Sequence, residues 1–327
     1  MIEIILNLSC SLPGQFPWQV QLKLESGQGF CGGIILSRSF ILTAAHCVKR
    51  KNHGPNLFDL YRTKLFVAVG IHDLREGFSI SKPITDKDKK LGKDIIEVET
   101  IIVHPKWNLP RGTAQNDIAL LKLKTSIQYG DPGQTENYQS WSRPACLPTP
   151  EFDSQVLQKI SKQDCVISGW GKTMGTGKND FGKEFNRREL VFGKISLNFP
   201  FNLCNDKFYK KTLNKNKSQF CAIDNDQDSS VDACQGDSGG PVSCAPGLLT
   251  NPSSGTSKVF HGHHPAKNDI RFAVTGLVSY GYSCKNDKNT RNLRPGVYTK
   301  ISSFYEWISK YTQEIQLVDG NTYQMEF

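Results

Sequence analysis

The chain has 327 residues, of which 38% are hydrophobic and 22% charged, and its formal net charge is +9. These proportions are ordinary for a globular protein and exclude global disorder, and no glycine triplet or heptad repeat indicates a collagen-like chain or a coiled coil. No apolar run approaches the ~18 residues that a membrane-spanning helix needs, so no membrane span is predicted.

Short β-rich runs separated by turn-rich loops follow one another along the chain. We predict strands, in chain order, at Trp18–Leu24, Gly33–Leu42, Lys64–Val69, Ile95–Val103, Ile118–Leu123, Cys165–Ser168, Leu190–Leu197, Pro241–Ser243, Phe272–Ser279 and Gly296–Lys300. The charge run Asp86–Lys90 is interpreted as a solvated loop. Ser302–Tyr311 has a helical period instead, because its large apolar residues share one face. This spacing favours an all-β sandwich or barrel over alternating β and α units.

Ten cysteines are scattered along the chain, with neither a Cys-x-x-Cys pair nor a Cys/His set of zinc spacing among them. An even number of widely spaced cysteines predicts five disulfides formed in an oxidising compartment. Two glycosylation sequons, Asn7-Leu8-Ser9 and Asn216-Lys217-Ser218, agree with a secreted, extracellular glycoprotein. The first residues lack the basic region of a signal peptide, so we expect the export signal upstream, in a longer modular protein.

Three segments carry the residues of a candidate hydrolytic site. They are Leu42-Thr43-Ala44-Ala45-His46-Cys47, Asn116-Asp117-Ile118-Ala119-Leu120-Leu121 and Asp232-Ala233-Cys234-Gln235-Gly236-Asp237-Ser238-Gly239-Gly240-Pro241. A serine hydroxyl needs a base within hydrogen-bond reach, and that base needs a partner that fixes its tautomer. Ser238, His46 and Asp117 supply this set. Each alone would suit a tight turn, a core histidine or a capping aspartate, whereas their conjunction favours nucleophilic catalysis.

The order His, Asp, Ser within these motifs resembles the trypsin/chymotrypsin-like serine proteases, over about Pro13 to Tyr311. The resemblance implies an all-β fold of two antiparallel six-stranded β-barrels (chymotrypsin-like) with a C-terminal α-helix. It assigns residues 1–11 to an N-terminal segment, 12–315 to the protease domain and 316–327 to a tail. Within that domain the first barrel is expected at about 17–128, the second at about 145–300 and the helix at about 302–313.

The same resemblance gives each motif residue a catalytic role. His46 is the expected general base and acid, Asp117 its orienting partner and Ser238 the nucleophile. The backbone amides of Gly236 and Ser238 are the expected oxyanion hole. The expected reaction is acyl transfer to water through an acyl-enzyme, and it calls for no cofactor or metal.

The resemblance also implies substrate-binding residues, at the positions where the family has them relative to the nucleophile. Asp232, six residues before Ser238, is the expected floor of the primary specificity pocket, where a carboxylate favours Arg or Lys side chains. Gly281 and Gly296 are the expected pocket walls. Ser279-Tyr280-Gly281 matches the family's Ser-Trp-Gly segment, which pairs with the substrate backbone, with Tyr280 replacing Trp. The alternative for Asp232 is a surface position, since an acidic loop precedes it.

The family pairing implies the disulfides Cys31–Cys47, Cys165–Cys244, Cys204–Cys221 and Cys234–Cys284. Cys10 and Cys146 remain, and two alternatives stay open for them. They pair with each other, or Cys146 tethers the protease to upstream domains.

Activation in this family buries a new N-terminal ammonium against the aspartate before the nucleophile, here Asp237. The expected Ile-Val-Gly-Gly start falls at Ile5-Leu6-Asn7-Leu8, and no Arg or Lys precedes it, because the first basic residue is Lys23. Three accounts remain: a truncated start, a non-tryptic activator, or a protease that works without the inserted N-terminus, as complement factor B-like proteases do.

The predicted function is a secreted serine endopeptidase that cleaves proteins after Arg or Lys. Loops longer than in digestive trypsins, after Cys47 and between Cys244 and Gly276, favour a regulatory protease of narrow specificity, made as a zymogen. Expected partners are protein substrates, an activating protease, serpin-type inhibitors and upstream domains, with no nucleic acid. The alternative is a non-catalytic or complex-dependent homologue acting as a binding module (complement factor B-like), which the intact triad disfavours.

Three further ligand hypotheses are disfavoured by the sequence. His261-Gly262-His263-His264 has no carboxylate at useful spacing, which favours a solvated loop over a zinc or copper site. Ile71 stands where trypsins begin their calcium loop with Glu. The basic loops lack the dense cluster expected of a site for heparin-like polyanions.

Overall fold

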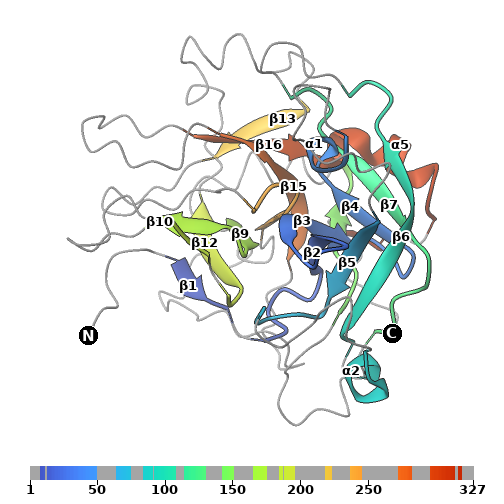
Figure 1. The fold of residues 1–327 in the computed structure, drawn as a ribbon. Coiled ribbons are helices and arrows are strands. Elements are labelled where there is room, and N and C mark those ends of the chain that lie inside the picture. Colours follow the sequence, from blue (N-terminus) through green and yellow to red (C-terminus); the bar gives the residue numbers. More distant parts are fainter. Residues whose placement is uncertain are drawn as a thin grey trace, which may run out of the picture.

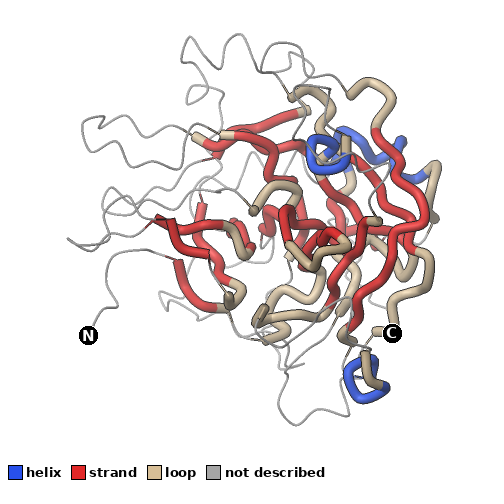
Figure 2. Tube along the Cα trace, in the orientation of Figure 1, coloured by secondary structure: helices blue, strands red, loops and turns tan. Residues whose placement is uncertain are grey.

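The fold is known from a computed structural model, drawn in Figure 1. The residues that it describes are 8–11, 13–49, 64–74, 84–90, 92–107, 114–129, 142–150, 165–174, 184–186, 188–195, 218–222, 236–244, 272–281, 295–313 and 316–318. Within these ranges the chain is built mainly of strands, which Figure 2 shows in red. None of the helices in the described part has both the length and the apolar character that crossing a bilayer requires.

The first half of the chain closes into a six-stranded antiparallel barrel of order β2-β3-β4-β7-β6-β5. Its strands are β2 (Gln19–Leu24), β3 (Gly29–Ile35), β4 (Phe40–Thr43), β5 (Leu65–Val69), β6 (Asp94–Val103) and β7 (Ala119–Leu123). Val20 and Leu22 alternate along β2 and pack against Val67 and Val69 of β5 in one buried cluster. Alternate residues of neighbouring strands therefore pack together inside the barrel, because successive side chains of a strand point to opposite faces.

The second half forms a seven-stranded antiparallel sheet of order β1-β12-β9-β14-β15-β16-β13. Its strands are β1 (Leu8–Cys10), β9 (Cys165–Gly169), β12 (Val191–Ile195), β13 (Gln219–Ala222), β14 (Pro241–Cys244), β15 (Ala273–Tyr280) and β16 (Gly296–Lys300). The expected all-β, chymotrypsin-like fold is confirmed. The second unit differs from the expected six-stranded barrel because the N-terminal strand β1 pairs with β12 and adds a seventh strand.

One predicted strand, Gly33–Leu42, is in fact two strands joined by a tight turn. The main-chain N–H groups of Leu36 and Ser37 both donate to the carbonyl of Phe40, and the Ser37 hydroxyl accepts the N–H of Ser39. The apolar residues on both sides of the turn continue the strand pattern, so the sequence conceals the reversal. The turn residues are those that favour local side-chain-to-backbone hydrogen bonds.

The charge run Asp86–Lys90 forms a short helix, α2, so its interpretation as a loop is wrong. Thr85 and Asp88 make reciprocal hydrogen bonds, from the main-chain N–H of each to the side chain of the other. This is the capping-box arrangement, which satisfies two amide groups at a helix start. The prediction considered only the charges of this segment, and charges alone do not indicate the hydrogen bonds between Thr85 and Asp88.

The C-terminal helix is shorter than the expected 302–313 and begins with a different geometry. Residues Ile301–Phe304 form a 3₁₀ turn, η3, which continues into helix α5 (Tyr305–Ser309). The three residues Gln316–Val318, expected in a tail, form strand β17, which pairs in parallel with β8 (Cys146–Pro148). Two further strands, β10 (Lys172–Met174) and β11 (Glu184–Asn186), pair with each other in a separate two-stranded antiparallel sheet.

The two halves share one hydrophobic core. Trp18 and Leu42 from the barrel, Val166 and Leu277 from the sheet, and Trp307 from α5 belong to the same buried cluster. Two polar contacts also join the halves: Trp18 Nε1 donates to Ser243 Oγ at 3.2 Å, and Ser168 Oγ donates to Gln19 Oε1 at 2.7 Å. A packed interface of this kind fixes how residues from the two halves face one another.

Candidate active site

His46 lies on the short helix α1 (Ala45–Val48), directly after strand β4 of the barrel. A disulfide between Cys31 and Cys47 ties α1 to strand β3. The Thr43 hydroxyl donates to the carbonyl of Gly32 on the same strand, at 2.8 Å. The backbone that carries His46 is therefore fixed on both sides, while its side chain keeps 25% of its surface exposed.

Asp117 lies two residues before β7, and its side chain is fully buried, with 0% of its surface exposed. Its Oδ1 accepts the main-chain N–H of His46 at 2.9 Å, and its Oδ2 lies 2.7 Å from Nδ1 of the same residue. Oδ2 also accepts the hydroxyl of Ser279 on β15 at 2.5 Å. Because the carboxylate is the acceptor, the imidazole carries its proton on Nδ1 and has its lone pair on Nε2.

Ser238 lies in the turn that precedes β14. Gly236 and Gly239, on either side of it, have φ angles of +105° and +77°, which side chains rarely tolerate. The carbonyl of Ser238 accepts the N–H of Gly32 from the barrel, and the N–H of Gly239 donates to Val278 of β15, both at 2.8 Å. A Cβ at Gly239 would collide with the Thr43 hydroxyl, so only glycine lets the turn approach the barrel this closely.

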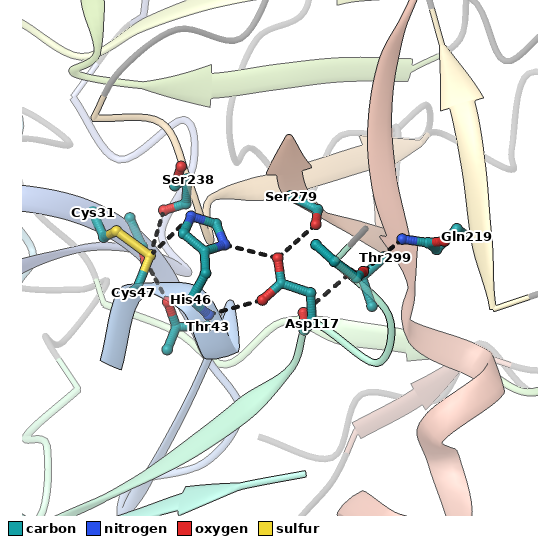
Figure 3. A network of polar contacts seen from close by, with 11 residues as sticks. Cys31, Thr43, His46, Cys47, Asp117, Gln219, Ser238, Ser279 and Thr299 are labelled. Carbon is teal, nitrogen blue, oxygen red and sulfur yellow. Dashed lines mark hydrogen bonds and ion pairs between the residues drawn. A yellow bond between two sulfur atoms is a disulfide. The ribbon is translucent and has the colours of Figure 1, made fainter. Parts of the chain in front are cut away.

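Figure 3 shows Ser238 beside the imidazole of His46, on the side away from Asp117. The sulfur of Cys47 lies 3.8 Å from His46 Nε2 and 3.6 Å from the carbonyl oxygen of Ser238. Both His46 and Ser238 are therefore close to the same sulfur atom. A sulfur in a disulfide has no proton, so Cys47 cannot donate a hydrogen bond to Nε2. The structure thus brings His46, Asp117 and Ser238 together from three distant segments.

Asp237 points into a pocket of main chain. Its Oδ1 accepts the N–H of Gly171 at 2.8 Å, and a Cβ at either Gly169 or Gly171 would collide with the carboxylate. The two glycines are therefore needed to let the backbone surround this group. Gly236 also lies close to this main chain, because a Cβ built on it would lie 3.1 Å from the Cα of Gly171.

The residues expected to bind substrate are described in part. Ser279 and Tyr280 end strand β15, and Gly281 follows them. A Cβ built on Gly281 would lie 3.7 Å from the Cα of Gly296, so the two glycines face each other as opposite walls would. Asp232 lies outside the described residues. The hydroxyl of Ser279 donates to the carboxylate of Asp117, a contact that was not predicted from the sequence. The Ser279–Gly281 motif indicated only pairing with the substrate main chain.

The described cysteines agree with the family pairing where both partners are visible. Cys31 is bonded to Cys47, and Cys165 to Cys244 across the neighbouring strands β9 and β14. Cys221 also forms a disulfide. Cys204, Cys234, Cys284 and the side chain of Cys10 lie outside the described residues, and Cys146 is half-buried on β8.

Among the described residues, one group of metal-ligating types lies close enough to hold an ion, namely Cys31, His46 and Cys47. Both sulfurs are joined in a disulfide, so neither can supply the thiolate that a metal site requires. This group therefore does not fit a metal. The segment His261–His264 lies outside the described residues, and Ile71 is a buried apolar residue after β5.

A comparison with models of known protein families agrees with this geometry. The family model named Trypsin matches residues 5–308, nearly the whole chain. Such a match supports a serine-protease hydrolase function in general. The chain belongs to the trypsin family.

Proposed function

We propose that this protein is a secreted serine endopeptidase that cleaves protein substrates after Arg or Lys and has a narrow, regulatory specificity. The observation that carries the proposal is the buried Asp117 carboxylate bonded to His46 Nδ1, with Ser238 beside the same imidazole. Trypsin-family proteases act on protein substrates, and this arrangement is the one that activates a serine hydroxyl at neutral pH.

In the proposed reaction the Ser238 oxygen attacks the scissile carbonyl carbon, and its proton passes to Nε2 of His46. The carbonyl oxygen becomes an oxyanion, which the N–H groups of Gly236 and Ser238 stabilise. The intermediate collapses, the C–N bond breaks, and His46 gives its proton to the leaving amine. Water then attacks the acyl-enzyme with His46 as base, which releases the acid and restores the Ser238 hydroxyl. Asp117 stabilises the imidazolium in both halves of the reaction.

The preference for Arg or Lys rests on Asp232 as the pocket floor. The facing glycines Gly281 and Gly296 support it, because a pocket for a long basic side chain needs walls without side chains. A carboxylate removed from water favours a cationic partner and disfavours an apolar one. Ser279 to Gly281 are the proposed edge for the substrate main chain.

Secretion and activation form part of the same proposal. Disulfides persist in oxidising compartments, and the bonds at Cys31–Cys47 and Cys165–Cys244 support an extracellular site of action. Asp237 is the proposed partner of a new N-terminal ammonium, since its carboxylate already occupies a main-chain pocket. Protein substrates, an activating protease, serpin-type inhibitors and upstream domains tethered at Cys146 are the proposed partners.

The proposal is tested by incubating the purified protein with a library of unstructured peptides and identifying new termini by mass spectrometry. We expect cleavage after Arg and Lys, and none by a Ser238→Ala variant of the same Tm. Cleavage after apolar residues would overturn the specificity while leaving the serine mechanism. A wild-type protein that cleaves nothing, with or without candidate partner proteins, would favour a binding role instead.

A further inference from the structure

Two side chains of the second half hold the main chain that carries Asp117, although Asp117 belongs to the first half. Gln219 Nε2 donates to the carbonyl of Ala114 at 2.8 Å, and Thr299 Oγ1 donates to the carbonyl of Asp117 at 3.0 Å. Both donors are buried, with 2% and 0% of their surfaces exposed. Figure 3 shows Gln219 and Thr299 on the side of Asp117 away from His46.

The sheet places these two donors next to each other. Gln219 on β13 and Thr299 on β16 are directly paired in the antiparallel register of the two strands. Their acceptors, Ala114 and Asp117, are three residues apart on the opposite half. The cross-strand pair Gln219 and Thr299 therefore hydrogen-bonds both ends of the turn from Ala114 to Asp117.

That turn has a backbone conformation that needs support. Asn116, directly before Asp117, has φ +54°, a left-handed conformation that asparagine tolerates better than most residues but that still costs free energy. Its side chain donates to the carbonyl of Lys106 at 2.8 Å, and its own carbonyl accepts the N–H of Ile118 at 2.9 Å. A strained turn persists when its surroundings over-determine it, and here the bonds to Ala114 and Asp117 come from the other half.

Catalysis would depend on this turn, because the proposed triad is divided between the halves. His46 and Asp117 come from the barrel, whereas Ser238 and the hydroxyl of Ser279 come from the second half. A small displacement of Asp117 would misalign His46 with respect to Ser238, and errors of about 1 Å can cost on the order of a hundredfold in rate.

We propose that Gln219 and Thr299 act together as positioning residues, which fix the Asp117 turn against the second half so that the triad assembles in one geometry. This inference rests on the proposed function. Both residues hydrogen-bond the main chain between Ala114 and Asp117, and the proposed effect on catalysis passes through that main chain. Sequence motifs give no sign of them, because both bonds arise from tertiary register.

The test uses Gln219→Met and Thr299→Val, which keep side-chain volume and remove one donor each, together with the double variant. Kinetics are measured on a basic peptide ester, with active sites titrated by a fluorophosphonate so that only folded enzyme is counted. We expect kcat to fall about tenfold for each single variant while KM stays within about twofold. The double variant should lose less than the product of the two effects, because both bonds hold one turn.

Two further readouts separate positioning from general stability. A displaced Asp117 stabilises the imidazolium less, so the midpoint of the acid limb of the pH–rate profile should move to lower pH in the variants. Thr299→Ser, which restores a hydroxyl, should recover kcat and that midpoint. Ser142→Ala is the matched control, since it removes another hydroxyl that donates to a carbonyl, that of Gln128, away from the site. It should change neither kcat nor the midpoint.

Unchanged kcat and an unchanged pH midpoint in the double variant would overturn the inference while leaving the proposed function in place. A wild-type protein that lacks esterase activity even after proteolytic activation would instead refute the proposed function itself. If Gln219→Met or Thr299→Val yields no folded protein, Gln219→Leu and Thr299→Ser decide the matter. Leucine removes the donor and places no polar group against the carbonyl of Ala114, whereas serine keeps the hydroxyl. Equal kcat in the two variants would contradict the inference.

Discussion

Replacing Asp117 by Asn tests the orientation of His46 through a single change from oxygen to an amide nitrogen. The Oδ1 position accepts a main-chain N–H from His46 and must remain an acceptor, so the new amide oxygen stays there. The amide nitrogen then takes the Oδ2 position, 2.7 Å from Nδ1 of His46. Because that nitrogen only donates, Nδ1 must accept and the imidazole proton moves to Nε2. The base next to Ser238 is thereby blocked.

The magnitude follows from the role that is lost. A positioned general base contributes about 10²–10⁴-fold, which corresponds to about 3 to 5 kcal/mol of transition-state free energy. We expect a loss of kcat/KM near the upper end at neutral pH, because the tautomer is reversed as well as the charge removed. The assay is hydrolysis of an Arg peptide ester between pH 6 and 10, with Tm measured in parallel.

The matched control is Asp94→Asn, at the start of β6. Burial raises the pKa of Asp94, and its carboxylate accepts the N–H of Ile95, so it too is a half-buried aspartate bonded to the main chain. The control should keep full activity. A folded Asp117→Asn variant that retains more than about a tenth of wild-type kcat/KM at pH 7 would refute the derivation.

Three other changes have definite expected outcomes. Asp232→Ser should lower kcat/KM for Arg and Lys substrates by about 30- to 5000-fold, since truncating one partner of a buried charge pair costs about 2–5 kcal/mol, while small apolar substrates change little. The double variant Cys31→Ala/Cys47→Ala removes a bond that spans 16 residues, worth about 3 kcal/mol, so differential scanning calorimetry should show Tm lower by about 6–12 °C. Burial, and to a lesser extent the positive charge of Lys106, lowers the pKa of His104 below its ordinary value of 6.5. The stability that this contributes is present above pH 6.5 and is lost as pH falls below it, because the unfolded chain then binds the proton more readily; His104→Phe should flatten this part of the Tm–pH curve.

Each of these outcomes can fail in a recognisable way. Equal turnover of Arg and Leu substrates by the wild-type protein would refute the proposal that Asp232 forms the floor of the specificity pocket. A Tm that does not change on loss of Cys31–Cys47 would show that packing alone fixes α1. Parallel Tm–pH curves for the wild-type protein and the His104 variant would mean that other groups control stability in acid.

The candidate catalytic residues could be predicted from sequence because their chemistry is written in short contiguous motifs. His46, Asp117 and Ser238 each lie in a short segment whose other residues determine the local backbone conformation. Near Ser238, for example, Gly236 and Gly239 adopt positive φ angles. Most barrel strands were also predictable, because they are short runs rich in β-branched and other apolar residues, bounded by turn-rich loops. The turn at Ser37–Ser39 and the helix α2 were not, since each depends on one or two side-chain hydrogen bonds that composition does not reveal.

The contacts that hold Asp117 were beyond sequence reasoning for a different reason. Gln219, Thr299 and Ser279 are separated from Asp117 by more than 100 residues, and their bonds exist only because two halves pack in one register. Strand β17 is a similar case, because its three residues pair with β8 only in the folded chain. Local patterns specify elements and motifs, whereas such long-range pairings come from tertiary packing.

The intact mass of the purified protein after treatment with a fluorophosphonate tests most directly whether the triad is assembled. A stoichiometric adduct located on Ser238, and absent in Ser238→Ala and His46→Ala variants of equal Tm, is the predicted result. It would require both an activated hydroxyl and a formed oxyanion hole. A folded wild-type protein that gains no adduct at Ser238, even after proteolytic cleavage has freed an N-terminal ammonium for Asp237, would contradict the proposal that this chain is an active serine hydrolase.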